Sequence, residues 1–414
     1  MPRQENTKEK IIECAFSLFE KPRMSDISLG EIAAKVGISK TAFFRHYKNK
    51  EELVEKMRER FFEAFAEMIS QLEPSRPAYN LKAVSKAVHC VFDFNEKYPN
   101  YLSYFLQMSF SDQILDEGMN LILLDNGINI LHDDIFKDKN KFSPRRMVPN
   151  YFEQTLLSFL FLAFCKNRAL LKIADFEKYK QKVADLIYNG LGKKKNPISP
   201  ERKKELDKIC EIQLESDKKS NRFFNAFVDL MQNSKSSRIT IKKIAEALGI
   251  SQSSVYSFFT NKSDYMANML LQETERAGGI IKERCAAAKN SDEAIYIMMR
   301  SEANYFALRP QVIALHGFFI IQEAAFSESD FDGVRAKTME MSKNYIIPDG
   351  VPNGFDFPVS DNATLFIKWI SSLTVAFMML GTRHKFPPEW LDFYVSTVYE
   401  MIQCGIKIIN KDGE

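Results

Sequence analysis

Apolar residues recur at helical spacing near the start of the chain. Ile32, Ala33 and Val36 fall on one face of a short predicted helix, because residues three and four positions apart lie on the same side of an α-helix. Ser28 stands where a side-chain oxygen can cap the free backbone N–H groups, and Gly37 stands where a left-handed turn would end the helix. The pattern predicts a short helix followed by a tight turn.

A second short helix is predicted directly after that turn. Ile38 would bury its side chain in the turn, and Ser39 would cap the next helix, which ends in the aromatic pair Phe44 and Tyr47. Two short helices at this spacing are typical of the helix-turn-helix, which presents its second helix to the major groove of DNA. Ordinary helical hairpins share the pattern, so one copy by itself leaves a purely structural role open.

The same pattern returns in the second half of the chain. Residues 31–50 match residues 243–262 without a gap, and Ile38 and Ile250 are 212 positions apart. The second copy repeats the apolar face and the closing glycine with Ile244, Ala245, Leu248 and Gly249. A repeat at a constant offset indicates an internal duplication.

The repeat extends beyond the helix-turn-helix. Pro99 and Pro310 follow apolar helical segments and are 211 positions apart, while Gly190 and Gly405 are 215 positions apart. The small drift in these offsets fits short loop insertions between the copies. The chain is therefore predicted to contain two units of about 200 residues, the usual length of one pair of domains.

The residues around the first copy resemble a known family. A predicted helix with Ile12, Ala15 and Phe19 on one stripe precedes the helix-turn-helix, and another long helix opens directly after it. This run is similar to the N-terminal DNA-binding domain of TetR-type (TetR/AcrR) transcriptional regulators. The resemblance is strong over residues 7–60 and weaker, but in register, over residues 219–270.

The resemblance implies an all-α fold of two tandem TetR-like units. Each unit would have a helix-turn-helix DNA-binding domain and a helical-bundle effector and dimerisation domain, and the scarcity of alternating apolar and polar positions agrees with a helical chain. The expected domains are residues 1–70 (first helix-turn-helix), 75–192 (first effector domain), 193–218 (linker and lead-in helix), 219–280 (second helix-turn-helix) and 285–414 (second effector domain).

The resemblance also implies which side chains contact DNA. In the first copy the positions that grip phosphate are Ser28 and Lys50, and the positions that face base edges or the nearby backbone are Lys40, Thr41, Arg45 and His46. In the second copy the matching residues are Thr240, Gln252, Ser253, Tyr256, Ser257 and Lys262.

The two copies differ in charge and in one aromatic residue. The family usually has a tyrosine whose hydroxyl reaches a phosphate; the first copy has Phe44 instead, whereas the second keeps Tyr256. The second helix of the first copy carries several cations, which suit phosphate neutralisation. The corresponding helix of the second copy is polar but nearly uncharged. The formal net charge of the whole chain, +3, indicates nothing about DNA by itself.

Aromatic residues are frequent in both predicted effector domains. Each of them is most simply a core residue, yet some are expected to line a pocket for a small apolar effector, since ligand pockets are mainly apolar with a few polar anchors. His89 and His316 are candidate anchors because they lie on otherwise apolar segments. The candidate ligand-binding residues are His89, Phe92, Phe105, Phe159, Phe306, His316, Phe319 and Trp369.

Composition and motifs argue against several other classes of protein. Hydrophobic residues make up 45% of the chain and charged residues 27%, which suits packed, soluble domains. Six cysteines without CxxC spacing indicate reduced thiols rather than a disulfide framework or a zinc site. No signal segment or membrane span is expected, which favours a cytoplasmic protein. Without a Gly-rich phosphate loop, GxSxG or HExxH motif, we expect no enzyme, cofactor or metal site.

Two DNA-binding units in one chain suggest a single-chain pseudo-dimer. The last two helices of each unit, near residues 151–168 with 176–190 and 362–382 with 390–409, are apolar enough to pack as a four-helix contact. The expected partner is an asymmetric double-stranded DNA operator, released when the effector binds, and further homodimerisation stays open. The alternative is an interaction or structural protein in which one or both helix-turn-helix domains no longer bind DNA.

Overall fold

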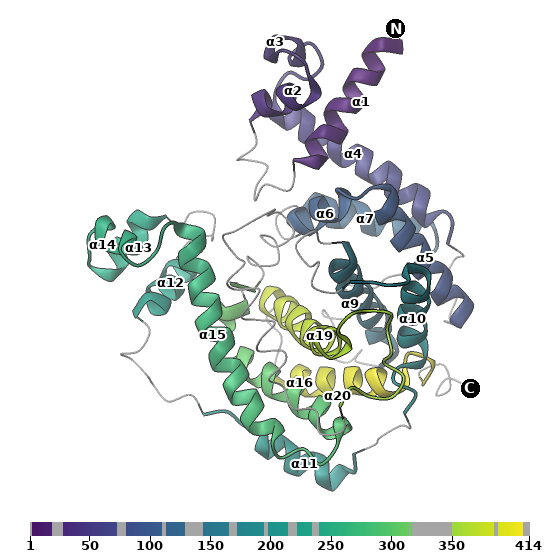
Figure 1. Ribbon diagram of the computed structural model, residues 1–414, viewed down its shortest axis with the longest axis vertical. Helices are drawn as coiled ribbons and strands as arrows, with labels where there is room; N and C mark the ends of the chain where they lie inside the picture. Colours follow the sequence, from purple (N-terminus) through teal and green to yellow (C-terminus); the bar gives the residue numbers. More distant parts are fainter. Residues whose placement is uncertain are drawn as a thin grey trace.

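All the regular elements of the described residues are helical, apart from one antiparallel bridge between Ile173 and Val359. The computed structural model describes residues 2–18, 28–72, 80–109, 113–128, 144–164, 172–193, 198–213, 222–233, 240–313, 315–316, 350–384 and 388–408. The predicted all-α fold class is therefore confirmed (Figure 1).

The first four helices form a unit that we call the first headpiece. It consists of α1 (Pro2–Ser17), α2 (Leu29–Val36), α3 (Lys40–Phe43) and the long helix α4 (Lys50–Ile69). The apolar stripes of these helices face one another, and they bury Ile11, Phe16, Ile32, Phe43 and Leu53 completely. Burial of such side chains, at about 1.5–3 kcal/mol each, holds the short helices α2 and α3 in place.

A second headpiece is built in the same way from the second half of the chain. It consists of α12 (Arg222–Asn233), α13 (Ile241–Leu248), α14 (Gln252–Tyr256) and the long helix α15 (Lys262–Cys285). Its core completely buries Phe227, Ile244, Val255 and Tyr265. Helices α1–α3 and α12–α14 project from the rest of the molecule at two separate places (Figure 1).

The remaining helices form two bodies that lie against each other. The first body contains α5 (Leu81–Lys97), α6 (Tyr101–Ser109), α7 (Gln113–Asp125), α9 (Pro144–Phe164) and α10 (Phe176–Asn189). The second body contains α16 (Ser291–Leu308), α19 (Asn362–His384) and α20 (Pro388–Cys404).

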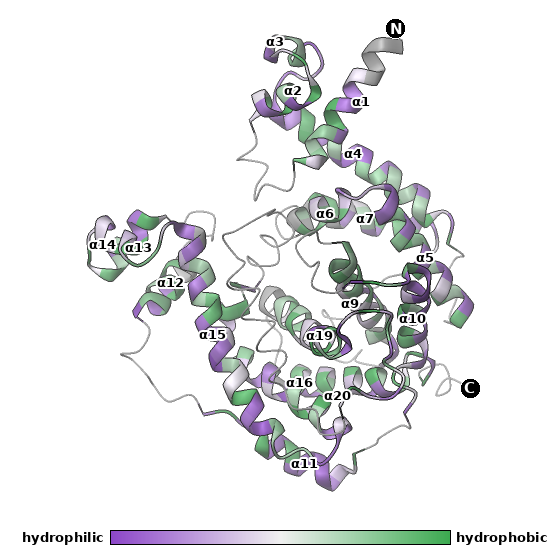
Figure 2. Cartoon of the chain, viewed as in Figure 1, coloured by the Kyte–Doolittle hydropathy of each residue, from purple (hydrophilic) through white to green (hydrophobic). Residues whose placement is uncertain are grey.

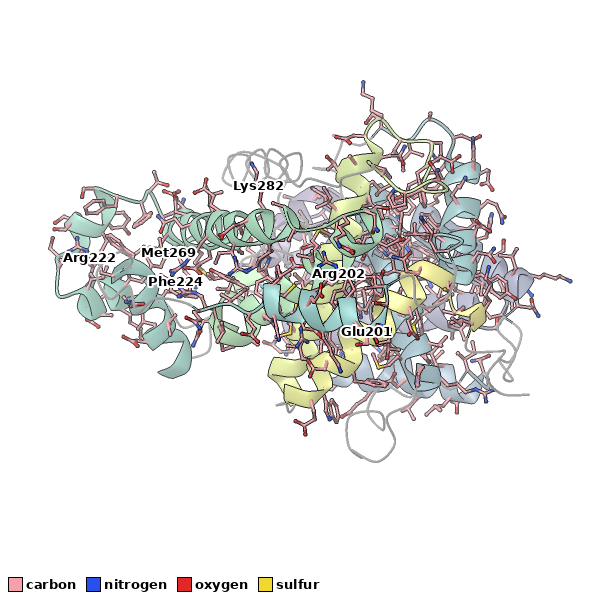
Figure 3. The ribbon with its side chains drawn as sticks, turned by 90° about the horizontal axis from the view of Figure 1, so that it is seen from below. Glu201, Arg202, Arg222, Phe224, Met269 and Lys282 are labelled. Atoms are coloured by element: carbon pink, nitrogen blue, oxygen red, sulfur yellow. The ribbon has the colours of Figure 1, made fainter. Side chains whose placement is uncertain are left out.

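Helix α11 (Pro200–Ile209) lies in the stretch predicted as a linker with a lead-in helix, and it packs on the second body. Leu206 and Cys210 are fully buried. The Arg202 guanidinium donates two hydrogen bonds, of 3.0 and 2.9 Å, to the Glu293 carboxylate in the first turn of α16. Glu201 and Arg202 lie on α11 alongside the body (Figure 3). This part of the stretch is therefore an anchored helix rather than a free tether.

Helices α9 and α10 of the first body pack against α19 and α20 of the second. Apolar positions on these four helices meet in one continuous core (Figure 2). Tyr179 on α10 donates a 3.2 Å hydrogen bond to the Phe159 carbonyl on α9, and Tyr394 on α20 donates a 2.6 Å bond to the Leu373 carbonyl on α19. The same tyrosine-to-carbonyl bond thus ties the helix pair of each body together.

The contacts between the two bodies are reciprocal. The Leu191 amide donates to the Ile402 carbonyl at 2.8 Å, and the Ile406 amide donates to the Ile187 carbonyl at 3.1 Å. Leu191 and Ile406 are 215 positions apart, as are Ile187 and Ile402. Each body therefore makes, with its equivalent residues, the same bond to the other, which is the signature of a two-fold, isologous interface.

Two pairs of equivalent residues meet at the centre of this interface. The hydroxyls of Ser158 and Ser372, 214 positions apart, lie 2.5 Å from each other. Gly190 and Gly405 meet where the two backbones cross, and a Cβ added to either would lie closer than 3.0 Å to the opposite backbone. Residues at matching positions of the repeat thus touch each other across this interface.

Helix α19 is apolar enough over Asn362–Gly381 to cross a membrane by length and composition alone, but 56% of that window is buried inside the molecule. Trp369 is fully buried there and donates a 3.3 Å hydrogen bond to the Thr155 hydroxyl of the other body. Packing in the four-helix contact accounts for its apolar sequence.

Candidate nucleic-acid interface

Both headpieces contain a helix-turn-helix with the same turn geometry. Gly37 ends α2 with φ 80°, and Gly249 ends α13 with φ 64°, in the left-handed region that glycine tolerates without a Cβ penalty. After each glycine an isoleucine amide closes the turn: Ile38 donates to the Ala33 carbonyl at 2.9 Å, and Ile250 to the Ala245 carbonyl at 3.0 Å. The turn predicted from the glycine-isoleucine pair is present in both copies.

Serine caps start both recognition helices, α3 and α14. The Ser39 oxygen accepts from the Ala42 amide at 3.1 Å, and the Ser251 oxygen accepts from the Ser254 amide at 3.0 Å. The caps are needed because helices this short have too few internal hydrogen bonds to be stable alone. One buried residue anchors each helix to its headpiece, Phe43 in α3 and Val255 in α14.

The first recognition helix turns its cations to solvent. Lys40, Thr41 and Arg45 are exposed, and His46 is half-buried. Phe44 is 44% exposed because the neighbouring Phe43 takes the place in the core. Lys40 and Thr41 on α3, and Arg45 and His46 just after it, are thus at least partly accessible to base edges or phosphates.

The two residues expected to grip phosphate in the first headpiece lie at helix starts. Ser28 caps α2 in a capping box: its oxygen accepts from the Glu31 amide at 3.1 Å, and its own amide donates to the Glu31 carboxylate at 2.8 Å. The sequence did not draw attention to Glu31, which places a negative charge beside Ser28. Lys50 is the first residue of α4 and is half-buried.

The second recognition helix exposes an uncharged polar surface. Gln252, Ser253 and Ser257 are exposed, and Tyr256 is 54% exposed. The Ser257 hydroxyl donates to the Ser254 carbonyl at 2.7 Å, so part of its hydrogen-bonding capacity is used within the helix.

The phosphate-gripping candidates of the second headpiece also lie at helix starts. Thr240 caps α13, accepting from the Lys243 amide at 3.3 Å. The acidic partner of Ser28 in the first headpiece is replaced here by Lys243 itself, so no capping-box carboxylate faces Thr240. Lys262 is the first residue of α15 and is half-buried.

One exposed residue of the second headpiece escaped the sequence interpretation. Phe258 lies 212 positions after His46, immediately beyond α14, and is 57% exposed. Its ring is 5.3 Å from that of Phe223 on α12. The constant offset of the repeat was the signal that could have found it.

The headpieces are joined to their bodies by different chemistry. Phe16 of the first headpiece packs on Tyr101 of α6 at 4.2 Å between ring centroids, and Tyr101 donates a 2.9 Å hydrogen bond to Glu13. In the second headpiece, Arg309 stacks 4.4 Å from the ring centroid of Phe224. Arg309 also pairs with the buried Glu273 of α15 at 2.7 Å.

Phe224 of α12 and Met269 of α15 are both buried (Figure 3). The first headpiece is thus held by aromatic packing and the second by a partly buried ion pair.

The candidate ligand-binding residues of the first body do not converge on one point. His89 on α5 has Nδ1 2.8 Å from the Ser85 carbonyl and Nε2 3.6 Å from the Glu177 carboxylate of the neighbouring helix α10. Phe92 is fully buried among the rings of α9 and α10, and Phe105 is only partly buried.

In the core shared by the two bodies, the candidate aromatic residues pack against other aromatic side chains. The ring of Phe159 stacks on Phe357 at 4.9 Å and lies 6.1 Å from Trp369. Phe306 contacts His316 edge-on at 5.4 Å, and burial lowers the pKa of His316 to about 4, which keeps the imidazole neutral. Phe319 lies outside the described residues. These contacts match the simpler interpretation, in which the aromatic residues fill the core.

The geometry of the first headpiece defines a helix-turn-helix DNA-binding domain. Residues 11–57 match the family model described as bacterial regulatory proteins, tetR family. Over these residues the first headpiece is therefore similar to bacterial regulatory proteins of the tetR family.

Similar proteins also include whole regulators. The biofilm operon icaADBC HTH-type negative transcriptional regulator IcaR of Staphylococcus epidermidis is 26% identical over 187 residues, which cover 96% of that protein and 44% of this chain. The protein of the same name from Staphylococcus aureus strain Newman is 24% identical over 193 residues, with the same coverage of both chains. The alignment thus takes up nearly all of each relative and less than half of this chain.

Proposed function

We propose that this protein is a transcriptional repressor that binds an asymmetric operator as a single-chain pseudo-dimer and is released by a small apolar effector. The observation that carries the proposal is the exposed recognition helix of the first headpiece, with Lys40 and Arg45 in solvent on a tetR-family domain. Repression is proposed because the similar staphylococcal proteins are named negative regulators. The protein would act in the cytoplasm, without a cofactor.

The four-helix contact supports the pseudo-dimer. Its reciprocal bonds, Leu191 to Ile402 and Ile406 to Ile187, are those of two equivalent units around a local axis. The coverage of the similar proteins supports it as well, since one regulator length occupies only 44% of this chain. A two-fold arrangement of two headpieces is how such proteins usually read two half-sites of DNA.

Helix α4 offers a route from the effector to DNA. It begins in the headpiece and packs on α7 of the first body, where Phe62 lies against Gly118 so closely that a Cβ on Gly118 would collide with the ring. A ligand that shifts α7 would therefore move α4 and the recognition helix with it. In thermodynamic terms the effector would favour a state whose two headpieces no longer fit the operator.

Replacing Lys40 and Arg45 together by alanine is expected to weaken binding to DNA from upstream of the protein's own gene by about 10²-fold. A base-reading arginine contributes about 1–3 kcal/mol, and each lost phosphate contact lowers the salt slope by about 1. Titrations at several salt concentrations measure both effects. The charge-matched control is Lys82→Ala with Lys204→Ala, two exposed lysines on α5 and α11. An interaction protein without DNA-binding activity would give equal, weak binding for all three proteins.

The pseudo-dimer predicts that one chain occupies one operator. We expect sedimentation or mass measurement to give a 1:1 complex of chain and operator fragment, and footprinting to show two different half-sites about one helical turn apart. Two chains on a strict palindrome would contradict the pseudo-dimer while leaving the DNA-binding function intact.

A further inference from the structure

We infer that the second headpiece selects an A·T-rich half-site through Gln252 and Phe258, whereas the first headpiece selects guanine through its cations. The inference rests on the proposed function, because it assigns the bases that each headpiece would read. The two half-sites of the operator would then differ in base content: the first headpiece would contact the half-site that contains guanine, and the second headpiece the half-site rich in A·T pairs.

The difference comes from substitutions at matched positions. Position by position, at the constant offset of 212, Lys40 is replaced by Gln252 and His46 by Phe258. Arg45 is likewise replaced by Ser257. The second headpiece thus loses three groups that are cationic or can become so, and gains an amide, a hydroxyl and an apolar ring.

These replacements lie on a surface of the same shape. Both recognition helices start at a serine cap after a left-handed glycine, and each is anchored by one buried side chain. Gln252 and Lys40 are both the first residue of their helix, and both are exposed. The two headpieces therefore present different chemistry in the same geometry.

The aromatic surface of the second headpiece is held in position. The ring of Phe223 lies 5.3 Å from that of Phe258 and 5.2 Å from that of Phe259, and the Arg222 guanidinium lies 5.1 Å from the Phe223 centroid. Phe258 is nevertheless 57% exposed. An exposed ring held in this way is available for contact with an apolar group of a base.

Two of the gained residues, Gln252 and Phe258, match known preferences for bases. Lysine and arginine donate to the O6 and N7 acceptors of guanine, whereas a glutamine amide pairs with N6 and N7 of adenine. An apolar ring such as that of Phe258 fits the methyl group of thymine. Of the described residues, none accepts or donates a hydrogen bond to the Gln252 amide, so the amide is available to a base.

The assignment can be tested by selecting operators from DNA in which both half-sites are randomised at a fixed spacing, using the full chain. We expect two different selected half-sites, one with guanine and one rich in A·T pairs. Gln252→Ala and Phe258→Ala should each reduce the A·T preference by about tenfold and leave the guanine half-site unchanged. Lys40→Ala should do the reverse.

Exchange of the two residues sharpens the test. The double variant Gln252→Lys with Phe258→His should give the second half-site a preference for guanine, and circular dichroism should show unchanged helix content. Two identical half-sites for the wild-type chain would overturn the inference and the asymmetric operator of the proposed function, but not DNA binding. A second half-site that differs from the first but has no A·T preference would overturn the inference alone. No enrichment of any DNA by the wild-type chain would overturn both.

Discussion

Replacing Gly405 by alanine is expected to lower the free energy of unfolding by about 4 kcal/mol or more. Gly405 has φ 71° and crosses the backbone of the first body, where an added Cβ would collide with the carbonyl of Tyr188 and the amide of Gly190. Neither atom belongs to a flexible side chain, so the helices of the two bodies would have to separate. Denaturant unfolding monitored by circular dichroism would measure the loss.

Alanine substitutions at two further glycines test whether the two bodies make equivalent contacts where their backbones cross. Gly192→Ala is the matched control, because Gly192 has φ 69° but nothing within 4 Å of its added Cβ. It should cost only the left-handed strain, about 1–2 kcal/mol. Gly190→Ala, the equivalent change in the first body, should cost about as much as Gly405→Ala. A cost for Gly405→Ala no larger than that of the control would show that the bodies do not cross here.

The stability of the protein is expected to fall as the pH rises from about 4 to about 8, through one buried carboxyl group. Glu302 on α16 is buried and accepts a 2.5 Å hydrogen bond from the Ser371 hydroxyl of α19, while Tyr394 of α20 lies near it. Burial raises the pKa of Glu302 to about 8. The folded state then keeps a proton that the unfolded chain releases.

The sign and size follow from proton linkage. Between the unfolded pKa, about 4.3, and the folded value, the folded state binds more protons, so each pH unit costs at most about 1.4 kcal/mol from this group. Above pH 8 the dependence on Glu302 should disappear. Glu302→Gln keeps the shape but cannot ionise, so its stability should be flatter across this window in denaturant titrations at several pH values.

A second glutamate on the same helix provides the control. The Arg202 guanidinium lowers the pKa of Glu293, so this carboxylate stabilises the fold above its unfolded pKa and loses that effect as the pH falls. Glu293→Gln should therefore lower the free energy of unfolding at neutral pH. Glu302→Gln should have the opposite effect and raise it. Identical pH profiles for the wild type and Glu302→Gln would show that Glu302 is not buried as described.

Several features of the headpieces could be predicted because their causes are local. The caps at Ser39 and Ser251 and the left-handed glycines Gly37 and Gly249 depend on residues within one helical turn. The tetR-family resemblance of the first headpiece is confirmed by the family match over residues 11–57.

Side-chain burial near the ends of short helices was harder to predict. The sequence placed Phe44 and Tyr47 at the end of this helix without assigning either ring to the core; in the structure Phe43 and Tyr47 enter the core and Phe44 faces solvent. A helix of four residues is little more than one turn, so its apolar periodicity is too short to say which ring points inward. The offset of 212 from His46 marks the position of Phe258, but the packing of its ring on Phe223, 35 positions earlier, is a tertiary contact that the offset does not give.

By itself, the sequence determined the helical class, the two helix-turn-helix segments and the contrast in charge between their recognition helices. These follow from periodicity, capping and residue type, which act over a few positions. Only the tertiary structure decided that Gly190 meets Gly405 and that Glu302 lies buried between helices of the second body. Such contacts join residues far apart in the chain, so they depend on how whole helices pack, and the energy that fixes them comes from the burial of both partners at once.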